Sequence, residues 1–202
     1  MTRRWLKERR RERYYKLAKK ENLRSRAAFK IKQLNEKYNI IKAGDRVLDL
    51  GSAPGGWLLS IKDIIGESGL LVGVDIQPIA EIEKVKFILG DITEPDTVER
   101  IRSVCSEFDV VTSDCSPNVS GNWELDHARQ IYLAEKSLEI ASKVLKSEGS
   151  FIVKVFQGEL FKEYINKMNS AFFKVIITKP EASRRASSEV YVIGLRFRGR
   201  RG

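Results

Sequence analysis

Short apolar runs alternate with segments of helical pattern along most of this chain. Helices are expected at about residues 56–65, 94–105, 126–146 and 158–170. The runs expected to form strands are 46–50, 69–76, 84–92, 108–114, 150–156, 173–179 and 190–197. Most of these runs are continuously apolar, as is typical of strands that helices cover on both faces. The alternation therefore predicts an α/β fold with a doubly wound, mostly parallel, seven-stranded sheet.

Basic residues are concentrated at the two ends of the sequence. Residues 1–32 contain 14 Lys or Arg and 3 Asp or Glu, and residues 179–202 contain 7 and 2. Since the whole chain has a net charge of +10, the middle is mildly acidic. Such segments are often simply solvated, but this density of charge also fits a surface that neutralises the phosphates of RNA. We expect residues 1–32 to form a basic, RNA-binding extension or helix that packs on a core domain of residues 33–202.

The sequence argues against several classes of protein. It contains no run of 18 apolar residues and no N-terminal apolar segment typical of a secretory signal. Cys105 and Cys115 lack metal-type spacing and suit a reducing compartment. The single histidine, His127, argues against a His-based metal site or a Ser-His-Asp triad, and we expect it to be a surface or half-buried helix residue. We therefore expect a cytoplasmic protein without a metal or a membrane partner.

The glycine-rich segment DLGSAPGGW, residues 49–57, follows the first predicted strand. A phosphate-binding loop requires Gly-x-x-x-x-Gly-Lys-Ser/Thr, whereas Gly56 is followed here by Trp57, which excludes that loop. The dinucleotide fingerprint Gly-x-Gly-x-x-Gly is matched only in part, by Gly51, Ala53 and Gly56. The turn by itself therefore does not identify its ligand.

Acidic residues near the ends of the predicted strands narrow the choice of ligand. Asp75 lies 24 residues after Gly51, where a carboxylate suits the hydroxyls of a ribose, and Asp91 could accept a hydrogen bond from an adenine amino group. Asp114 ends the fourth predicted strand, and Asp49 adjoins the glycine turn. Each could alone be a helix cap or a solvated loop end. Together, carboxylates at one sheet edge repel a pyrophosphate and favour a cationic ligand without phosphate, such as S-adenosylmethionine (SAM).

Lys154 interrupts the otherwise apolar strand SFIVKVF. A lysine is rarely buried unless it is paired or functional, although one near a strand end can extend to water. We favour a functional lysine, because its strand is expected to adjoin the strand that ends at Asp114. Taken alone, Glu189 reads as a solvated charge and Lys30 as one of many basic residues.

Five segments carry a family resemblance when they are taken together: NLRSRAAFKI (22–31), DLGSAPGGW (49–57), VVTSDCSPNVSG (110–121), SFIVKVFQG (150–158) and SSEVYVIG (187–194). Together they resemble the FtsJ-type ribose 2′-O-methyltransferases of ribosomal RNA. The resemblance extends from about Trp5 to Arg196 and implies a Rossmann-like, SAM-dependent methyltransferase fold. A Lys-Asp-Lys-Glu tetrad carries catalysis in this family, and its matches here are Lys30, Asp114, Lys154 and Glu189.

The same resemblance implies a SAM pocket. We expect the cofactor to be bound by Gly51, Gly55, Gly56, Trp57, Asp75, Asp91 and Asp114. The main departure from the family is the pair Cys115-Ser116, which bears on the fine shape of the pocket. The segment after Asp114 also lacks the Asn/Asp-Pro-Pro-Tyr/Phe motif of enzymes that methylate base amino groups.

The activity that the resemblance implies is 2′-O-methylation of large-subunit rRNA, at a uridine of the peptidyl-transferase region, with rRNA of the large subunit as partner. Lys154 is the candidate base, or it polarises the hydroxyl oxygen together with Lys30. We expect Arg184 and Arg185 to hold RNA phosphates at the rim of the site.

Methylation of a tRNA anticodon loop and a noncatalytic role in RNA binding or ribosome assembly are alternatives. The acidic strand ends and basic termini disfavour a nicotinamide dehydrogenase. The oligomeric state is open, with a monomer favoured.

Overall fold

The computed structural model describes residues 27–184 and 186–199. The strands of this part of the chain form one sheet in the order β3-β2-β1-β4-β5-β7-β6. The strands are β1 (Arg46–Leu50), β2 (Leu70–Asp75), β3 (Val85–Leu89), β4 (Phe108–Ser113), β5 (Leu145–Phe156), β6 (Phe172–Thr178) and β7 (Glu189–Phe197). The helices are α2 (Ala27–Tyr38), α3 (Gly56–Ile65), α4 (Asp96–Val104), α5 (Trp123–Val144) and α6 (Phe161–Ala171).

The sheet is mixed, because β7 runs antiparallel to both of its neighbours, β5 and β6. The other pairings, from β3 through β2, β1 and β4 to β5, are parallel. The prediction of a mostly parallel sheet thus holds for the pairings from β3 to β5 and missed the reversal of β7. A parallel connection needs a crossover, usually a helix, whereas the 179–188 segment between β6 and β7 contains none.

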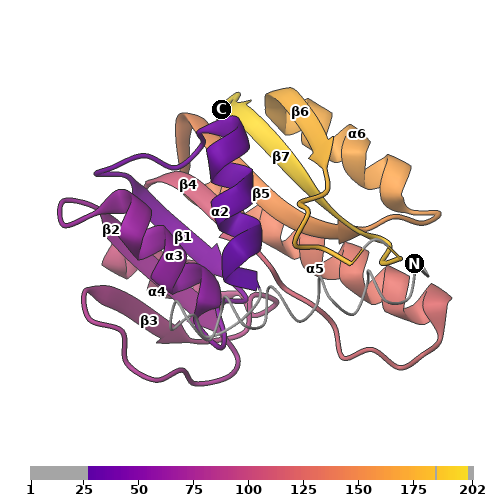
Figure 1. Ribbon diagram of the computed structural model, residues 1–202, viewed down its shortest axis with the longest axis horizontal. Helices are drawn as coiled ribbons and strands as arrows, with labels where there is room; N and C mark the ends of the chain where they lie inside the picture. The colour runs from indigo at the N-terminus through magenta and orange to yellow at the C-terminus, as the bar shows by residue number, and fades with distance from the viewer. Residues whose placement is uncertain (1–26, 185, 200–202) are drawn as a thin grey trace, which may run out of the picture.

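Helices cover both faces of the sheet, as Figure 1 shows. Alternate residues of a strand point to opposite faces, so neighbouring residues of β1 join different clusters. Val47 packs in one cluster with apolar residues of α2 and α3, and Leu48 packs in the other with residues of α4, α5 and α6. The doubly wound arrangement therefore follows from the continuously apolar strands.

Several elements differ in extent from the predicted bounds. α5 begins at Trp123, because the side chain of Asn122 caps it by accepting a hydrogen bond from the amide of Leu125. β5 begins at Leu145, before its predicted start at residue 150, so its first residues lie in the range predicted for the preceding helix. The predicted domain boundary between residues 32 and 33 falls within α2. The basic residues before position 27, Arg185 and residues 200–202 lie outside the described part of the chain.

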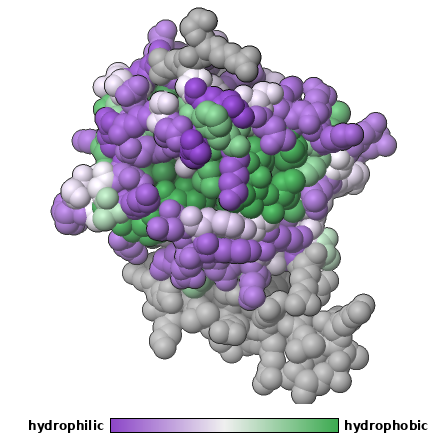
Figure 2. All heavy atoms as spheres, turned by 90° about the horizontal axis from the view of Figure 1, so that it is seen from above, coloured by the Kyte–Doolittle hydropathy of each residue, from purple (hydrophilic) through white to green (hydrophobic). Residues whose placement is uncertain are grey.

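Polar residues dominate the rim of the molecular surface seen from above, and a hydrophobic area lies at its centre (Figure 2). Apolar side chains are therefore accessible on this face of the protein.

None of the helices in the described part of the chain combines the length and the apolar character needed to span a bilayer.

Candidate active site

The four residues of the predicted tetrad form two ion pairs. The Nζ of Lys154 lies 3.3 Å from Oδ1 of Asp114 and donates a 2.7 Å hydrogen bond to the backbone oxygen of the same residue. The Nζ of Lys30 donates to Oε1 of Glu189 at 2.5 Å. Lys154 is the most buried member, with 6% of its side chain exposed. Residues from distant parts of the sequence therefore meet at one end of the sheet.

Tyr191 connects the two ion pairs, and the sequence reasoning did not identify it. Its hydroxyl donates a 2.7 Å hydrogen bond to Oδ1 of Asp114, and the Nζ of Lys30 lies 5.6 Å from the centre of its ring. Burial raises the pKa of the Tyr191 phenol well above its usual range, so the hydroxyl stays a donor. The available signal was the alternation of the last strand, which places Tyr191 on the same face as Glu189.

The pairing of β5 with β7 sets the positions of these side chains. Lys154 lies opposite Tyr191 in the antiparallel register, and Phe156 lies opposite Glu189. Gln130 of α5 donates a 2.9 Å hydrogen bond to the backbone oxygen of Lys154. The tetrad therefore rests on the paired ends of two strands and on a buried side chain of the covering helix.

Lys30 reaches the site from α2, which packs on α3 through a hydrogen bond from the Ser60 hydroxyl to the backbone oxygen of Ala28 at 3.2 Å. Its partner Glu189 also accepts a 3.2 Å hydrogen bond from Ser183. The segment before Ser183 is tied to α2, because the amide of Ala182 donates to the side chain of Gln33 at 3.0 Å. The loop before β7 and α2 thus hold the second ion pair together.

The glycine turn passes very close to the segment that follows β4. Gly51 has a φ of 73°, and a Cβ on it would lie 2.7–2.9 Å from Sγ, N and Cα of Cys115. Gly55, with a φ of 100°, is the N-cap of α3, which begins at Gly56. The ring of Trp57 stacks on that of Tyr191 with their centres 5.7 Å apart. The turn and the tetrad are therefore parts of one site.

The carboxylates expected to bind the cofactor also organise their own loops. Asp75 accepts hydrogen bonds from the amides of Ala53 and Gln77, each at 2.8 Å, and so fixes the glycine turn to the end of β2. Asp91 was expected at the end of the third strand, but β3 ends at Leu89. Asp91 lies in the following turn, where its Oδ1 accepts from both the amide and the hydroxyl of Thr93 at 2.8 Å.

Three buried polar atoms around the turn have no hydrogen-bond partner among the described residues. They are Oδ2 of Asp49, Oγ of Ser52 and Nε1 of Trp57. Buried polar atoms are nearly always satisfied by protein, water or ligand. A carboxyl oxygen, a hydroxyl and an indole donor beside several carboxylates fit a polar, cationic ligand. The residues present therefore suit SAM.

Asp49 is fully buried in β1, where Thr112 donates a 2.6 Å hydrogen bond to its Oδ1. Burial raises the pKa of its carboxyl from 3.8 to about 8, the Thr112 hydrogen bond opposes this rise, and the nearby carboxylates of Asp114 and Asp75 add to it. Asp49 therefore keeps a proton in the folded protein at pH values where the unfolded chain releases it.

This proton makes the stability of the ligand-free protein depend on pH. As pH rises from about 4 to about 8, the free energy of unfolding should fall for the wild type relative to Asp49→Asn. At pH 8 the variant should be more stable by on the order of a few kcal/mol, since a pKa difference of one corresponds to about 1.4 kcal/mol. Denaturant unfolding of both proteins between pH 5 and pH 8 measures this difference. Parallel pH profiles for the two proteins would contradict the assignment.

His127 is more buried than predicted, with 4% of the residue exposed. Its Nε2 accepts a 3.1 Å hydrogen bond from the amide of Leu160, so it holds the segment before α6. Burial lowers the pKa of this imidazole.

Within residues 27–184 and 186–199, no group of three or more His, Cys, Asp or Glu side chains is arranged to hold a metal ion.

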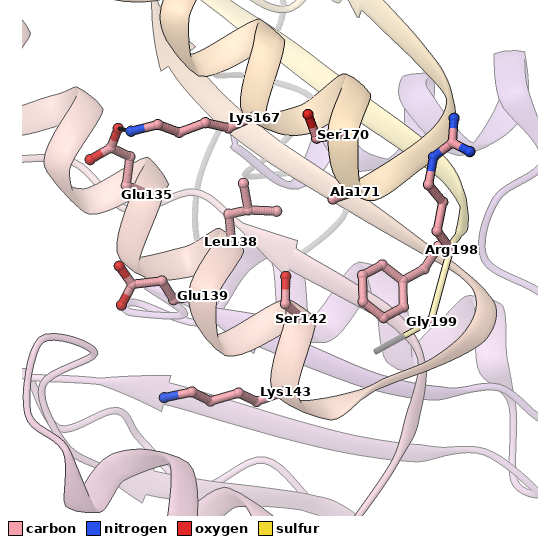
Figure 3. A pocket seen from close by; sticks show the side chains of 11 residues that line it. Glu135, Leu138, Glu139, Ser142, Lys143, Lys167, Ser170, Ala171, Arg198 and Gly199 are labelled. Carbon is pink, nitrogen blue, oxygen red and sulfur yellow. Dashed lines mark hydrogen bonds and ion pairs between the residues drawn. The ribbon is translucent and has the colours of Figure 1, made fainter. Parts of the chain in front are cut away.

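A surface groove lies between α5, α6 and the end of β7 (Figure 3). Leu138, Ala171 and Phe197 line it, and Lys167 pairs with Glu135 beside it at 2.6 Å. Phe197 is at the opposite end of β7 from Glu189. The groove is therefore separate from the candidate active site.

The chain is similar to known proteins over most of its length. Residues 23–197 match the FtsJ-like methyltransferase family. The chain is 48% identical over 204 residues to the ribosomal RNA large subunit methyltransferase E of Methanocaldococcus jannaschii, covering 98% of this chain and 83% of that protein. The protein of the same name from Methanosarcina acetivorans is 52% identical over 190 residues, which are 93% of this chain and 69% of that protein.

A solved structure extends the likeness to the fold. It is a crystal structure described as a ribosomal RNA methyltransferase from Plasmodium falciparum. The two share a TM-score of 0.79 and 26% sequence identity over 88% of this chain and 100% of the other. On the family match and the archaeal relatives together, the chain belongs to the FtsJ-like methyltransferase family.

Proposed function

We propose that this protein is a SAM-dependent 2′-O-ribose methyltransferase of large-subunit rRNA. The observation that carries the proposal is the buried Lys154–Asp114 pair, which Tyr191 links to Lys30 and Glu189 beside the glycine turn. The name shared by the archaeal relatives, ribosomal RNA large subunit methyltransferase E, supports the substrate class. In finer detail, we propose that the target is a uridine of the peptidyl-transferase region and that the protein acts in the cytoplasm.

The cofactor would lie along the glycine turn and the ends of β1, β2 and β3. The residues proposed to hold it are Gly51, Gly55, Gly56, Trp57, Asp75, Asp91 and Asp114. When bound, SAM supplies a methyl group that its sulfonium activates for transfer. The unpartnered buried atoms of Asp49, Ser52 and Trp57 support this placement.

Lys154 is the residue proposed to contact the ribose 2′ oxygen. Its Nζ donates to the backbone oxygen of Asp114 and lies 3.3 Å from Oδ1 of the same residue. In this position Lys154 would orient the 2′ hydroxyl, and the hydroxyl proton would pass to the neighbouring carboxylate of Asp114 when the oxygen takes up the methyl group that SAM supplies. Burial of Lys154 strengthens this interaction, because little water competes for the Nζ.

The ion pair of Lys30 and Glu189 would form the opposite wall of the ribose site. Its charges offset each other, and its position is fixed by Ser183 and by the ring of Tyr191. Such alignment of a nucleophile with the transferred group can contribute about 7–11 kcal/mol to lowering a barrier. The tetrad would therefore act mainly by holding the sugar hydroxyl in line.

RNA contacts beyond the ribose are proposed for the basic extension of residues 1–32 and for the loop before β7. Arg184 of that loop is exposed. The hydrogen bond between Ala182 and Gln33 holds this loop against α2, so the loop and the exposed side of α2 would face the same RNA.

The test is to incubate the full chain and SAM with three substrates: protein-free large-subunit rRNA, large ribosomal subunits that lack the modification, and tRNA. Mapping of 2′-O-methyl groups should find one new modified ribose in large-subunit rRNA and none in tRNA. Methylation confined to tRNA would move the substrate to the anticodon-loop alternative. Failure to methylate any of the three would remove the enzymatic proposal.

A further inference from the structure

Trp123, the first residue of α5, presents an aromatic ring at the surface beside the candidate active site. Its indole stacks on the ring of His127, with centres 5.6 Å apart and planes 16° apart. It also stacks on Phe156, at 6.1 Å and 18°. In spite of these contacts, 48% of Trp123 remains exposed. The three rings form an aromatic platform, of which Trp123 is the most exposed member.

The platform is held in place by hydrogen bonds and close packing. His127 accepts a hydrogen bond from the amide of Leu160, and a Cβ on Gly158 would lie 2.7–2.9 Å from its ring. Asp126 accepts hydrogen bonds at 2.8–3.0 Å from the amides of Ser120 and Gly121, which fixes the segment leading into α5. Trp123 therefore stands on a rigid support, so little conformational entropy is lost when a ring stacks on it.

The platform adjoins the tetrad through Phe156. This residue lies two positions after Lys154 on β5 and is opposite Glu189 in the pairing with β7. In Figure 1, the beginning of α5 lies at the same end of the sheet as the beginning of β7. An RNA strand whose ribose lies at the tetrad would therefore have a neighbouring base within reach of the platform.

We propose that Trp123 stacks on an unpaired base of the RNA substrate, next to the methylated ribose. The inference rests on the proposed function and adds a substrate-binding residue to it. Proteins that bind single-stranded RNA commonly stack its bases on aromatic side chains, and this contact tolerates any base because each has a π-face. The RNA at the site is thus locally unpaired, with one base held against the indole.

The experiment compares Trp123→Ala, Trp123→Phe and Tyr132→Ala in the full chain. Tyr132 is the matched control, because it lies on the same helix and is 49% exposed. Binding is measured by fluorescence anisotropy on labelled single-stranded fragments of large-subunit rRNA, and KM and kcat are measured on the rRNA that is methylated. Thermal unfolding and SAM binding of each variant are measured alongside.

Trp123→Ala should weaken RNA binding and raise the KM for RNA by about 5- to 100-fold, the range that loss of one stacked base produces. Trp123→Phe should restore most of the loss, and Tyr132→Ala should have no effect. SAM affinity should not change. The slope of RNA affinity against salt concentration should also stay the same, because no phosphate contact is removed.

Equal RNA binding by the wild type and Trp123→Ala would overturn the proposal. So would a defect seen only with assembled ribosomal subunits and not with free RNA, since the platform would then bind a protein. A wild type that binds RNA but methylates none refutes the proposed function, and the binding comparison still decides whether Trp123 stacks on a base.

Discussion

Replacing Lys154 with alanine should slow methyl transfer by about 10²- to 10⁴-fold, the range typical of losing a group that handles the reacting proton or oxygen. Single-turnover methylation of rRNA at saturating SAM measures the rate, and calorimetry measures SAM affinity, which should be retained. Lys154→Arg should also be impaired, because Lys154 is only 6% exposed and a guanidinium is larger and planar.

The control for this result is Lys146→Ala. Lys146 lies on the same strand and also pairs with an aspartate, since its Nζ lies 2.6 Å from Oδ1 of Asp109. Loss of this partly exposed pair should cost at most about 1 kcal/mol of stability and leave turnover unchanged. A Lys154→Ala enzyme that works at a rate near that of the wild type would show that Lys154 does not contact the reacting oxygen.

Gly51→Ala is the second substitution with a large expected effect. A φ of 73° costs an alanine about 1–2 kcal/mol. The added Cβ would also lie 2.8–2.9 Å from the backbone N and Cα of Cys115. This backbone cannot move aside without also displacing Asp114, the residue before it. We expect a loss of about 2–4 kcal/mol in the free energy of unfolding, in the range of overpacking combined with backbone strain. SAM binding should weaken as well.

Gly66→Ala separates the two causes. Gly66 has a φ of 65°, but nothing lies within 4 Å of a Cβ built on it. Its substitution should therefore cost only the backbone term, about 1–3 kcal/mol for a φ of 65° with a ψ of −164°, and should not change SAM binding. Denaturant unfolding and calorimetry of both variants measure the contrast. An equal loss of stability in the two variants would show that the close approach of Gly51 to Cys115 does not contribute to the free energy of unfolding.

Local pattern alone was sufficient for much of the fold. The apolar runs identified all the strands of the sheet, and the start of the last strand was placed at Glu189 to within one residue. The reversal of β7 was missed, because the apolar run 190–197 carries no information on strand direction. The direction of β7 depends on the connection that precedes it. The start of α5 depends on the Asn122 cap, and the apolar pattern does not show that either.

The tetrad could be assigned only through the family resemblance. Lys154 was conspicuous in its strand, but neither Lys30 nor Glu189 was distinguishable from a solvated charge. Their pairing depends on long-range contacts across the fold. Tyr191 was not identified from the sequence, because its role depends on which groups of β5 and of the segment after β4 face it. Trp123 and His127 were likewise placed only by the packing of α5 on β5.

The place of β7 between β5 and β6 bears on when the enzyme becomes competent during its synthesis. β6 precedes β7 in the chain, yet β6 lies at the edge of the sheet and β7 lies between it and β5. A nascent chain that ends before residue 189 would carry Lys154 and Asp114 but neither Glu189 nor Tyr191. The proposed ribose site would be complete only once β7 has left the ribosome and inserted between β5 and β6, so chains that lack β7 should not methylate RNA.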